Sequence, residues 1–240
     1  MIQSGAFSLT YRFQFPDGLE KEFLVQLDRK NCSILTPERD VYPEWTRLKY
    51  KQCRQCPLNS VEHPRCPVAV NIVEIVEFFQ DFKSVETAIV EVETPQRVTK
   101  GGKTALFPAI SSLIGIYMVT SGCPVLDKLR PMARFHLPFA DTEETVYRAL
   151  SMYALAQYFR HKKGGEADWD FEGLKEIYRN INRLNIDFAK RLHNESISEA
   201  TTNAITSLDC FAQEIDFSIS ESMLEEIEGL FDDYLNNDQS

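Results

Sequence analysis

The sequence lacks most of the features by which enzymes and nucleic-acid-binding proteins are usually identified. It contains no H-E-x-x-H metal-binding motif, no serine elbow and no pair of carboxylates spaced for acid–base catalysis. Gly102-Lys103-Thr104 resembles the end of a phosphate-binding loop, but Arg97 stands where such a loop requires its first glycine. The formal net charge of −10 gives no positive field that would attract a phosphate backbone. We therefore expect neither a nucleotide site nor extended nucleic-acid binding.

Signals for export and for membrane insertion are also lacking. Residues 1–11 have neither the basic start nor the apolar run of a secretory signal, so we expect a cytoplasmic protein. Residues 104–126 carry no charge and are long enough to cross a bilayer, but two prolines, two glycines and several hydroxyl side chains favour a buried helix instead. In a reducing compartment the six cysteines are better explained as metal ligands or core residues than as disulfides.

Alternating hydrophobic residues predict a small antiparallel sheet near the N-terminus. The alternation runs over residues 7–15 and again over 23–27, and the turn signal Pro16-Asp17-Gly18 separates the two stretches. These segments predict a hairpin, to which residues 85–93 add a third strand. We interpret the polar, glycine-containing segment 95–103 as a connection rather than a strand.

Helical periodicity dominates the rest of the chain. It predicts helices over residues 67–82, 141–162, 170–193 and 198–213, and Asp141 with Glu144 forms a capping-box pattern at the start of the second. A final acidic helix follows, whose predicted inward-facing residues are Met223, Leu224, Ile227, Leu230, Phe231, Tyr234 and Leu235.

The predicted fold class is α+β: a small antiparallel sheet with a cysteine-rich metal loop, followed by a helical bundle. A strand and metal-loop lobe over residues 1–97 would pack against a helical lobe over 98–240 as one compact unit.

The most specific chemical signal is the segment from Cys53 to Cys66. Its spacing, C-x2-C-x6-H-x2-C, supplies the four candidate metal ligands Cys53, Cys56, His63 and Cys66. A C-x2-C pair directs two thiolates at one centre, and four such ligands form the closed tetrahedral site of structural zinc. Because Pro67 follows Cys66, we expect Cys66 to cap a helix, where the dipole would lower the pKa of its thiol.

Two alternatives to this zinc site stay open. Cys123 is also followed by a proline and is an alternative fourth ligand, which would make an all-cysteine site with Cys53, Cys56 and Cys66. Such a site would hold either zinc or an iron–sulfur cluster. The remaining possibility is that no metal binds and the cysteines are buried or free.

A second candidate site lies further along the chain. The segment from Arg130 to Phe139 reads R-P-M-A-R-F-H-L-P-F and is interpreted as an ordered loop. Arg130, Arg134 and His136, near Cys123, could bind an anionic small molecule or activate the thiol. The plain structural interpretation is that both arginines pair with Glu143, Glu144 or another core-facing carboxylate, and that His136 finds its partners within the packed loop.

Several of these motifs together resemble a known sequence family. They are Cys56-Pro-Leu, Cys66-Pro-Val-Ala-Val-Asn71, Ser112-Leu-Ile-Gly, Ser121-Gly-Cys-Pro124, the segment Arg130–Phe139 and Gln157-Tyr158-Phe159. The chain is similar over nearly its whole length to an uncharacterised bacterial family of unknown function. The resemblance implies a bacterial cytosolic protein, but it implies no activity, ligand or partner.

These observations lead to three hypotheses of function. The first is a non-catalytic protein with a structural zinc ion that acts as an adaptor, regulator or assembly subunit, with a protein partner or self-association. The second is an enzyme or anionic-ligand receptor that uses Cys123, Arg130, Arg134 and His136. The third is an iron–sulfur redox or sensor protein.

Overall fold

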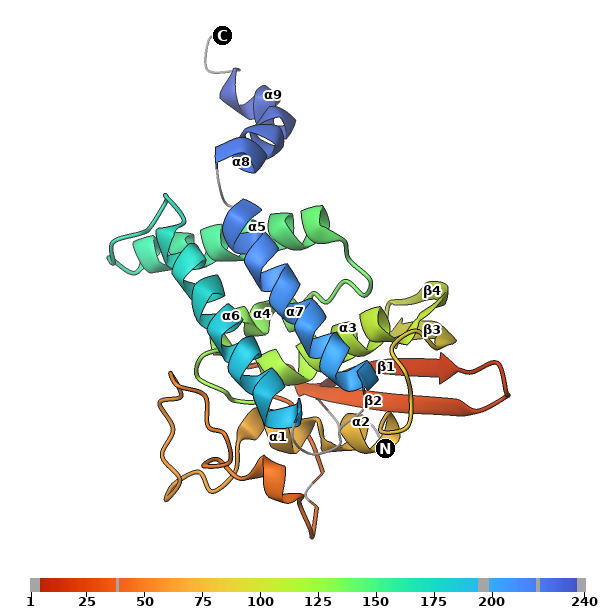
Figure 1. Ribbon diagram of the computed structural model, residues 1–240. Helices are drawn as coiled ribbons and strands as arrows, with labels where there is room; N and C mark the ends of the chain where they lie inside the picture. The colour runs from red at the N-terminus through yellow and green to blue at the C-terminus, as the bar shows by residue number, and fades with distance from the viewer. Residues whose placement is uncertain (1–4, 38, 194–198, 219–220, 237–240) are drawn as a thin grey trace.

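The computed structural model describes residues 5–37, 39–193, 199–218 and 221–236 and shows an α+β fold (Figure 1). Its sheet contains the strands β1 (Ala6–Gln14), β2 (Glu20–Asp28), β3 (Thr87–Thr94) and β4 (Arg97–Ala105). All neighbouring pairs are antiparallel, in the order β2-β1-β3-β4. The predicted fold class, the hairpin and the third strand are confirmed.

The alternation in β1 gives the sheet one apolar face. Leu9, Tyr11 and Phe13 have no exposed surface, whereas the intervening side chains are partly exposed. The short helices α1 (Pro67–Asn71) and α2 (Val73–Phe78) help to cover this face. Just after α2, the ring of Phe79 lies 5.3 Å from that of Phe13, so the aromatic cluster of the core joins the hairpin to this pair of helices.

The uncharged segment forms α3 (Leu106–Thr120), a buried helix. The hydroxyl groups of Tyr11 and Ser112 are 2.8 Å apart, which places α3 against the apolar face of the sheet. Among the residues that the structure describes, no helix is both long enough and apolar enough to cross a membrane.

The helical part of the fold continues from α3 into the short α4 (Arg130–Arg134) and three long helices. These are α5 (Thr142–Lys162), α6 (Glu172–His193) and α7 (Glu199–Ser218), and α7 packs against both α3 and α6 (Figure 1). The capping box predicted for α5 is present: Glu144 N donates to Asp141 Oδ1 at 2.8 Å, and Asp141 N donates to Glu144 Oε2 at 3.0 Å.

Three element predictions were wrong in detail. Residues 97–105 form the edge strand β4 instead of a connection; because most of its side chains are exposed, apolar alternation is absent from the sequence. The helix predicted over residues 67–82 is divided at Ile72, whose φ and ψ of −100° and 5° leave the helical region. The predicted loop 130–139 begins with the helical turn α4.

The C-terminal helices α8 (Glu221–Glu228) and α9 (Asp232–Leu235) extend beyond the end of the bundle, joined by a 3-10 turn over Gly229–Phe231 (Figure 1). Leu224 and Ile227 pack against the core as predicted. The prediction of inward-facing side chains was wrong further on, because Leu230 and Tyr234 are 74% and 81% exposed. Phe231 and Leu235 are exposed too. The side chain of Met223 lies outside the described residues.

Candidate functional site

Four cysteines from three parts of the chain lie near one another in the fold. Cys53 and Cys56 lie in the irregular segment before α1, Cys66 is the N-cap of α1, and Cys123 follows α3. Their thiols are close enough for Cys53 to interact electrostatically with the other three. All six cysteines of the chain are free, so no disulfide constrains this group. The structure therefore brings together the all-cysteine set that includes the alternative ligand Cys123.

Backbone amides are directed at two of these sulfur atoms. The amides of Val68 and Ala69 act to lower the pKa of the Cys66 thiol, and those of Val125 and Leu126 act in the same way on Cys123. Both arrangements follow from the Cys-Pro sequence, because proline begins a turn whose next amides point back at the cysteine. Amide donors of this kind stabilise thiolate better than thiol.

The segment that carries the cysteines is fixed by backbone hydrogen bonds. Cys56 N donates to Cys53 O at 3.0 Å, which closes the C-x2-C turn. Cys66 N donates to Thr46 O at 2.8 Å, and Arg65 Nη1 donates to Thr46 Oγ1 at 2.7 Å. Since Thr46 is itself buried, the bonds from Arg65 and Cys66 hold the C-terminal end of the segment to the core.

A buried arginine lies near two of these thiols, those of Cys53 and Cys66. Arg191 of α6 is 1% exposed and donates to the carbonyl oxygens of Trp45, Arg47 and Leu48 at 2.8, 2.7 and 3.2 Å. Among the described residues it has no carboxylate within ion-pair distance, and its Nε atom has no hydrogen-bond partner. The nearby group that can become negative is the set of thiols, since Arg191 interacts electrostatically with Cys53 and Cys66.

Burial controls the acidity of these thiols. It raises the pKa of Cys53 to about 12 and that of Cys123 to about 11, and it also raises the pKa of Cys66. The prediction that the helix N-terminus would leave Cys66 with a lowered pKa was wrong, because loss of hydration outweighs the effects of Arg191 and the nearby amides. Without a cation to bind, these three cysteines are therefore neutral thiols near neutral pH.

His63 stands apart from this arrangement as an exposed residue of the turn before Cys66. Its backbone N–H donates to Asn59 O at 3.0 Å. Within residues 5–37, 39–193, 199–218 and 221–236, no group of three or more His, Cys, Asp and Glu side chains has an arrangement that could hold a metal ion as it stands. Metal binding would therefore require the side chains to draw closer together.

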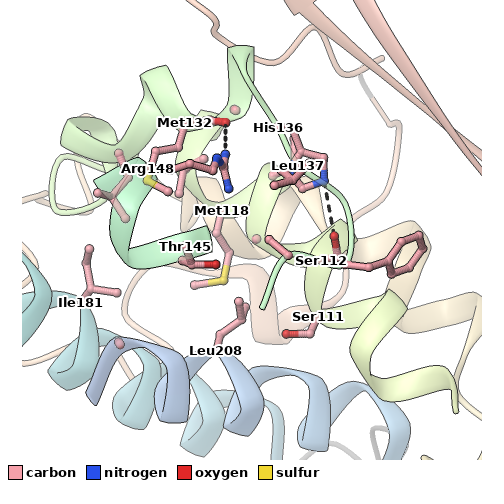
Figure 2. Close-up of a pocket in the computed structure, with 18 of the residues that line it drawn as sticks. Ser111, Ser112, Met118, Met132, His136, Leu137, Thr145, Arg148, Ile181 and Leu208 are labelled. Carbon is pink, nitrogen blue, oxygen red and sulfur yellow. Dashed lines mark hydrogen bonds between the residues drawn. The ribbon is translucent and has the colours of Figure 1, made fainter. Parts of the chain in front are cut away.

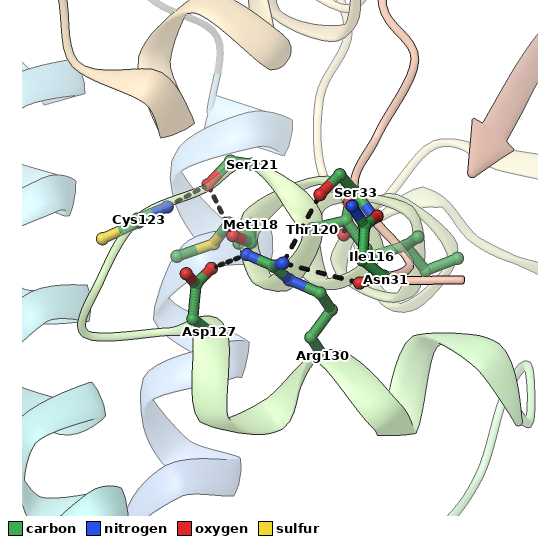
Figure 3. Close-up of polar contacts among 9 residues, drawn as sticks. All are labelled: Asn31, Ser33, Ile116, Met118, Thr120, Ser121, Cys123, Asp127 and Arg130. Carbon is green, nitrogen blue, oxygen red and sulfur yellow. Dashed lines mark hydrogen bonds and ion pairs between the residues drawn. The ribbon is translucent and has the colours of Figure 1, made fainter. Parts of the chain in front are cut away.

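The second candidate site is not assembled as one group. Arg130 bonds with Asp127 and with the Asn31 carbonyl and the Ser33 hydroxyl, both at 3.4 Å, as Figure 3 shows. The guanidinium of Arg134 lies 4.2 Å from the centre of the Phe7 ring. Arg130 thus pairs with a carboxylate, as the plain structural interpretation has it, and that carboxylate is Asp127.

His136 takes part in a buried triangle of polar groups. Its Nε2 atom lies 2.6 Å from Tyr11 Oη and 3.3 Å from Ser112 Oγ. Burial, together with the nearby charge of Arg148, lowers the pKa of His136 to about 3. Burial also raises the pKa of Tyr11, so the hydrogen bond joins two neutral groups, and the tautomer of the imidazole sets which of them donates. The triangle thus fixes the loop after α4 to β1 and α3.

A cavity of about 360 Å³ lies beside this triangle, between α3, α5, α6 and α7 (Figure 2). Its lining includes His136 but neither Arg130 nor Arg134. The arginine that reaches it is Arg148 of α5, which no sequence motif indicated. A single arginine within a helical pattern gave no signal, because its environment is created by segments that are distant in the sequence.

The chain belongs to the family described as Domain of unknown function (DUF6901), whose model matches residues 9–232. This confirms the resemblance to an uncharacterised family. Comparison with curated proteins found no match, and comparison with solved structures found none either.

Proposed function

We propose that this protein binds one structural zinc ion through Cys53, Cys56, Cys66 and Cys123, and that it acts without catalysis as an adaptor, regulator or assembly subunit in the cytoplasm. The observation that carries the proposal is the convergence of four free cysteines from three parts of the chain beside the buried Arg191. His63 is replaced in this ligand set by Cys123.

The charges fit a thiolate–metal centre. Zinc with four thiolates carries an excess of about two negative charges, which a buried site must offset. Arg191 supplies one positive charge without a carboxylate among the described residues, and the four amides at Cys66 and Cys123 supply further positive dipoles. A buried cation of this kind is costly beside neutral thiols and favourable beside thiolates.

The geometry also allows the sulfur atoms to come together. A tetrahedral site with Zn–S bonds of about 2.3 Å requires sulfur atoms about 3.8 Å apart. Cys53 and Cys56 lie in an irregular, half-buried segment outside any helix or strand, so their side chains can move by a rotamer change. Cys66 and Cys123, which are both buried, would form the fixed half of the site.

The first test is metal analysis and an absorption spectrum of protein purified without oxygen. We expect about one zinc per chain and no visible absorption band. Iron with absorption near ~400 nm would replace the zinc proposal by an iron–sulfur cluster on the same cysteines. A well-folded protein that neither contains metal nor binds added zinc would contradict the proposal.

Single substitutions identify the fourth ligand. Cys123→Ser should remove the zinc and lower the melting temperature, whereas His63→Asn should retain about one zinc per chain. Cys210→Ser is the matched control, because Cys210 is an exposed cysteine of α7. Loss of zinc in His63→Asn together with its retention in Cys123→Ser would show that the ligand set is wrong.

A further inference from the structure

The cavity between α3, α5, α6 and α7 has the size and lining of a small-molecule site. Its volume of about 360 Å³ falls within the range of about 300–1,000 Å³ typical of ligand pockets. Most of its wall is apolar, with side chains such as Ile116, Met118, Ile181 and Leu208. None of the four cysteines belongs to the described lining, so a ligand in this cavity would not contact the thiols of the proposed zinc site.

One cation reaches the cavity and has no carboxylate partner. The Nη2 atom of Arg148 donates to the carbonyl oxygens of Met132 and Phe135 at 3.1 and 2.9 Å, which leaves Nε and Nη1 without a described partner. No Asp or Glu belongs to the described lining. Glu144, one turn earlier on α5, accepts the amide hydrogen of Asp141 in the capping box. The free donors of Arg148 are therefore available to an anion.

The net charge of the lining selects the kind of anion. The lowered pKa of His136 keeps its imidazole neutral, so Arg148 provides the one positive charge of the described lining. A guanidinium pairs with a carboxylate through two parallel hydrogen bonds, and the charges then cancel. A phosphate dianion would bring a second negative charge that nothing in the described lining offsets.

Two further polar groups face the cavity without partners. Ser111 of α3 and Asn185 of α6 are each 2% exposed, and neither Ser111 Oγ nor Asn185 Oδ1 has a hydrogen-bond partner among the described residues. Figure 2 shows Ser111 across the cavity from Arg148. Because an amide oxygen only accepts hydrogen bonds, a ligand that pairs with Asn185 Oδ1 must carry a hydrogen-bond donor. Buried groups of this kind cost free energy when left unpaired, and a suitable ligand removes that cost.

We propose that this cavity binds a small carboxylic acid with a largely apolar body and a hydroxyl group remote from the carboxylate. The carboxylate pairs with Arg148, the body occupies the apolar wall, and the hydroxyl donates to Asn185 Oδ1 or bonds with Ser111.

The proposal is tested by calorimetric titration of the full chain with decanoate, 10-hydroxydecanoate and 1-decanol as probes. Decanoate should bind with one-to-one stoichiometry. Its affinity should exceed that of 1-decanol by about 10- to 100-fold, because a charge-assisted hydrogen-bonded pair contributes a binding free energy of this size. 10-Hydroxydecanoate should bind more tightly still. Equal affinity for decanoate and 1-decanol, or no binding of either, would overturn the proposal without any variant.

Variants assign the effect to the cavity. Arg148→Met should weaken decanoate binding by about 10- to 100-fold while leaving 1-decanol binding unchanged. Arg148→Lys retains the charge and provides a second variant if the methionine variant does not fold. The matched control is Arg160→Met, since Arg160 is an exposed arginine on the same helix. Decanoate binding that survives in Arg148→Met, or that falls equally in Arg160→Met, would place the acid elsewhere.

Discussion

At the scale of single residues, three polar groups join segments that are far apart in the sequence. Tyr11, Ser112 and His136 come from β1, α3 and the loop after α4, and their hydrogen bonds of 2.6 to 3.3 Å fix that loop over the core. The imidazole in this arrangement is neutral, because burial and the nearby charge of Arg148 both disfavour its protonated form. The stability of the protein should therefore respond to the protonation of His136.

The sign of this response follows from the two states of the chain. In the unfolded chain His136 titrates near ~6.5, whereas burial and the charge of Arg148 hold its pKa at about 3 in the folded protein. Between these values the unfolded state binds the extra proton, so the free energy of unfolding falls as the pH is lowered. The slope approaches about 1.4 kcal/mol per pH unit.

We expect His136→Gln to lack this component of the pH dependence, since glutamine can accept a hydrogen bond and does not titrate. The measurement is the free energy of unfolding by urea for both proteins from about pH 7 to about pH 5, where the wild type should lose up to about 2 kcal/mol more than the variant. Identical pH profiles would mean that His136 is not held neutral. The matched control is His161→Gln, because His161 is an exposed histidine.

At the scale of elements, the sequence predicted those whose residues have one apolar face. The hairpin and the long helices were found by periodicity, because their buried and exposed positions alternate regularly. The edge strand β4 was missed because it pairs on one side and exposes most of its side chains. The polar residues of β4 are held by pairing with β3. For example, Lys100 of β4 forms an ion pair with Glu91 of β3 at 2.8 Å.

A close contact between β4 and the loop after α4 explains one glycine of that strand. A Cβ atom on Gly101 would lie 2.7 Å from the Cζ atom of the Phe139 ring. Phe139 is itself constrained by a φ of 61°, an unusual conformation for a side chain of this size. Because both residues line the cavity, the loop closes that side of it by packing on β4.

Gly101→Ala should therefore lower the free energy of unfolding by about 1–3 kcal/mol, as overpacking generally does. Gly115→Ala is the matched control: the nearest atom to its added methyl is Leu208 Cδ2 at 3.5 Å, an ordinary contact, and alanine favours the helix by about 1 kcal/mol. We expect Gly115→Ala to be neutral or stabilising in chemical denaturation. A Gly101→Ala protein as stable as the wild type would show that Phe139 does not pack firmly on β4.

At the scale of the whole molecule, the predicted boundary between residues 97 and 98 falls within β4. Contacts also connect the two predicted lobes elsewhere: Ile34 N donates to Thr120 O at 3.1 Å, and Arg191 of α6 binds carbonyl groups of residues 45–48. The candidate site could be predicted only in part from the sequence. Cysteine spacing and Cys-Pro pairs identified the four cysteines of the candidate site, but nothing in a helical pattern distinguishes Arg191 or Arg148 from surface arginines.

Arg191 provides the sharpest test of how the two predicted lobes are held together. Arg191→Met would leave three backbone carbonyls of the segment before Cys53 without this donor, and it would remove the cation beside the thiols. We expect the free energy of unfolding to fall by on the order of 4 kcal/mol, since each hydrogen bond to a charged group contributes about 1.5–3 kcal/mol and the losses partly overlap. Zinc affinity should fall as well.

The control is Arg183→Met on the same helix, because the side chain of Arg183 is 55% exposed and its ion pair with Glu176 is 4.0 Å long. Such a surface pair contributes about 0–1 kcal/mol.

Urea unfolding should be followed both by the fluorescence of tryptophan, which includes the buried Trp45, and by far-ultraviolet circular dichroism, which reports mainly on the helices. If the lobes unfold together, both signals change at one midpoint, and Arg191→Met lowers that midpoint much more than Arg183→Met does. Equal effects of the two substitutions would mean that Arg191 neither joins the lobes nor serves as the buried countercharge of the thiols.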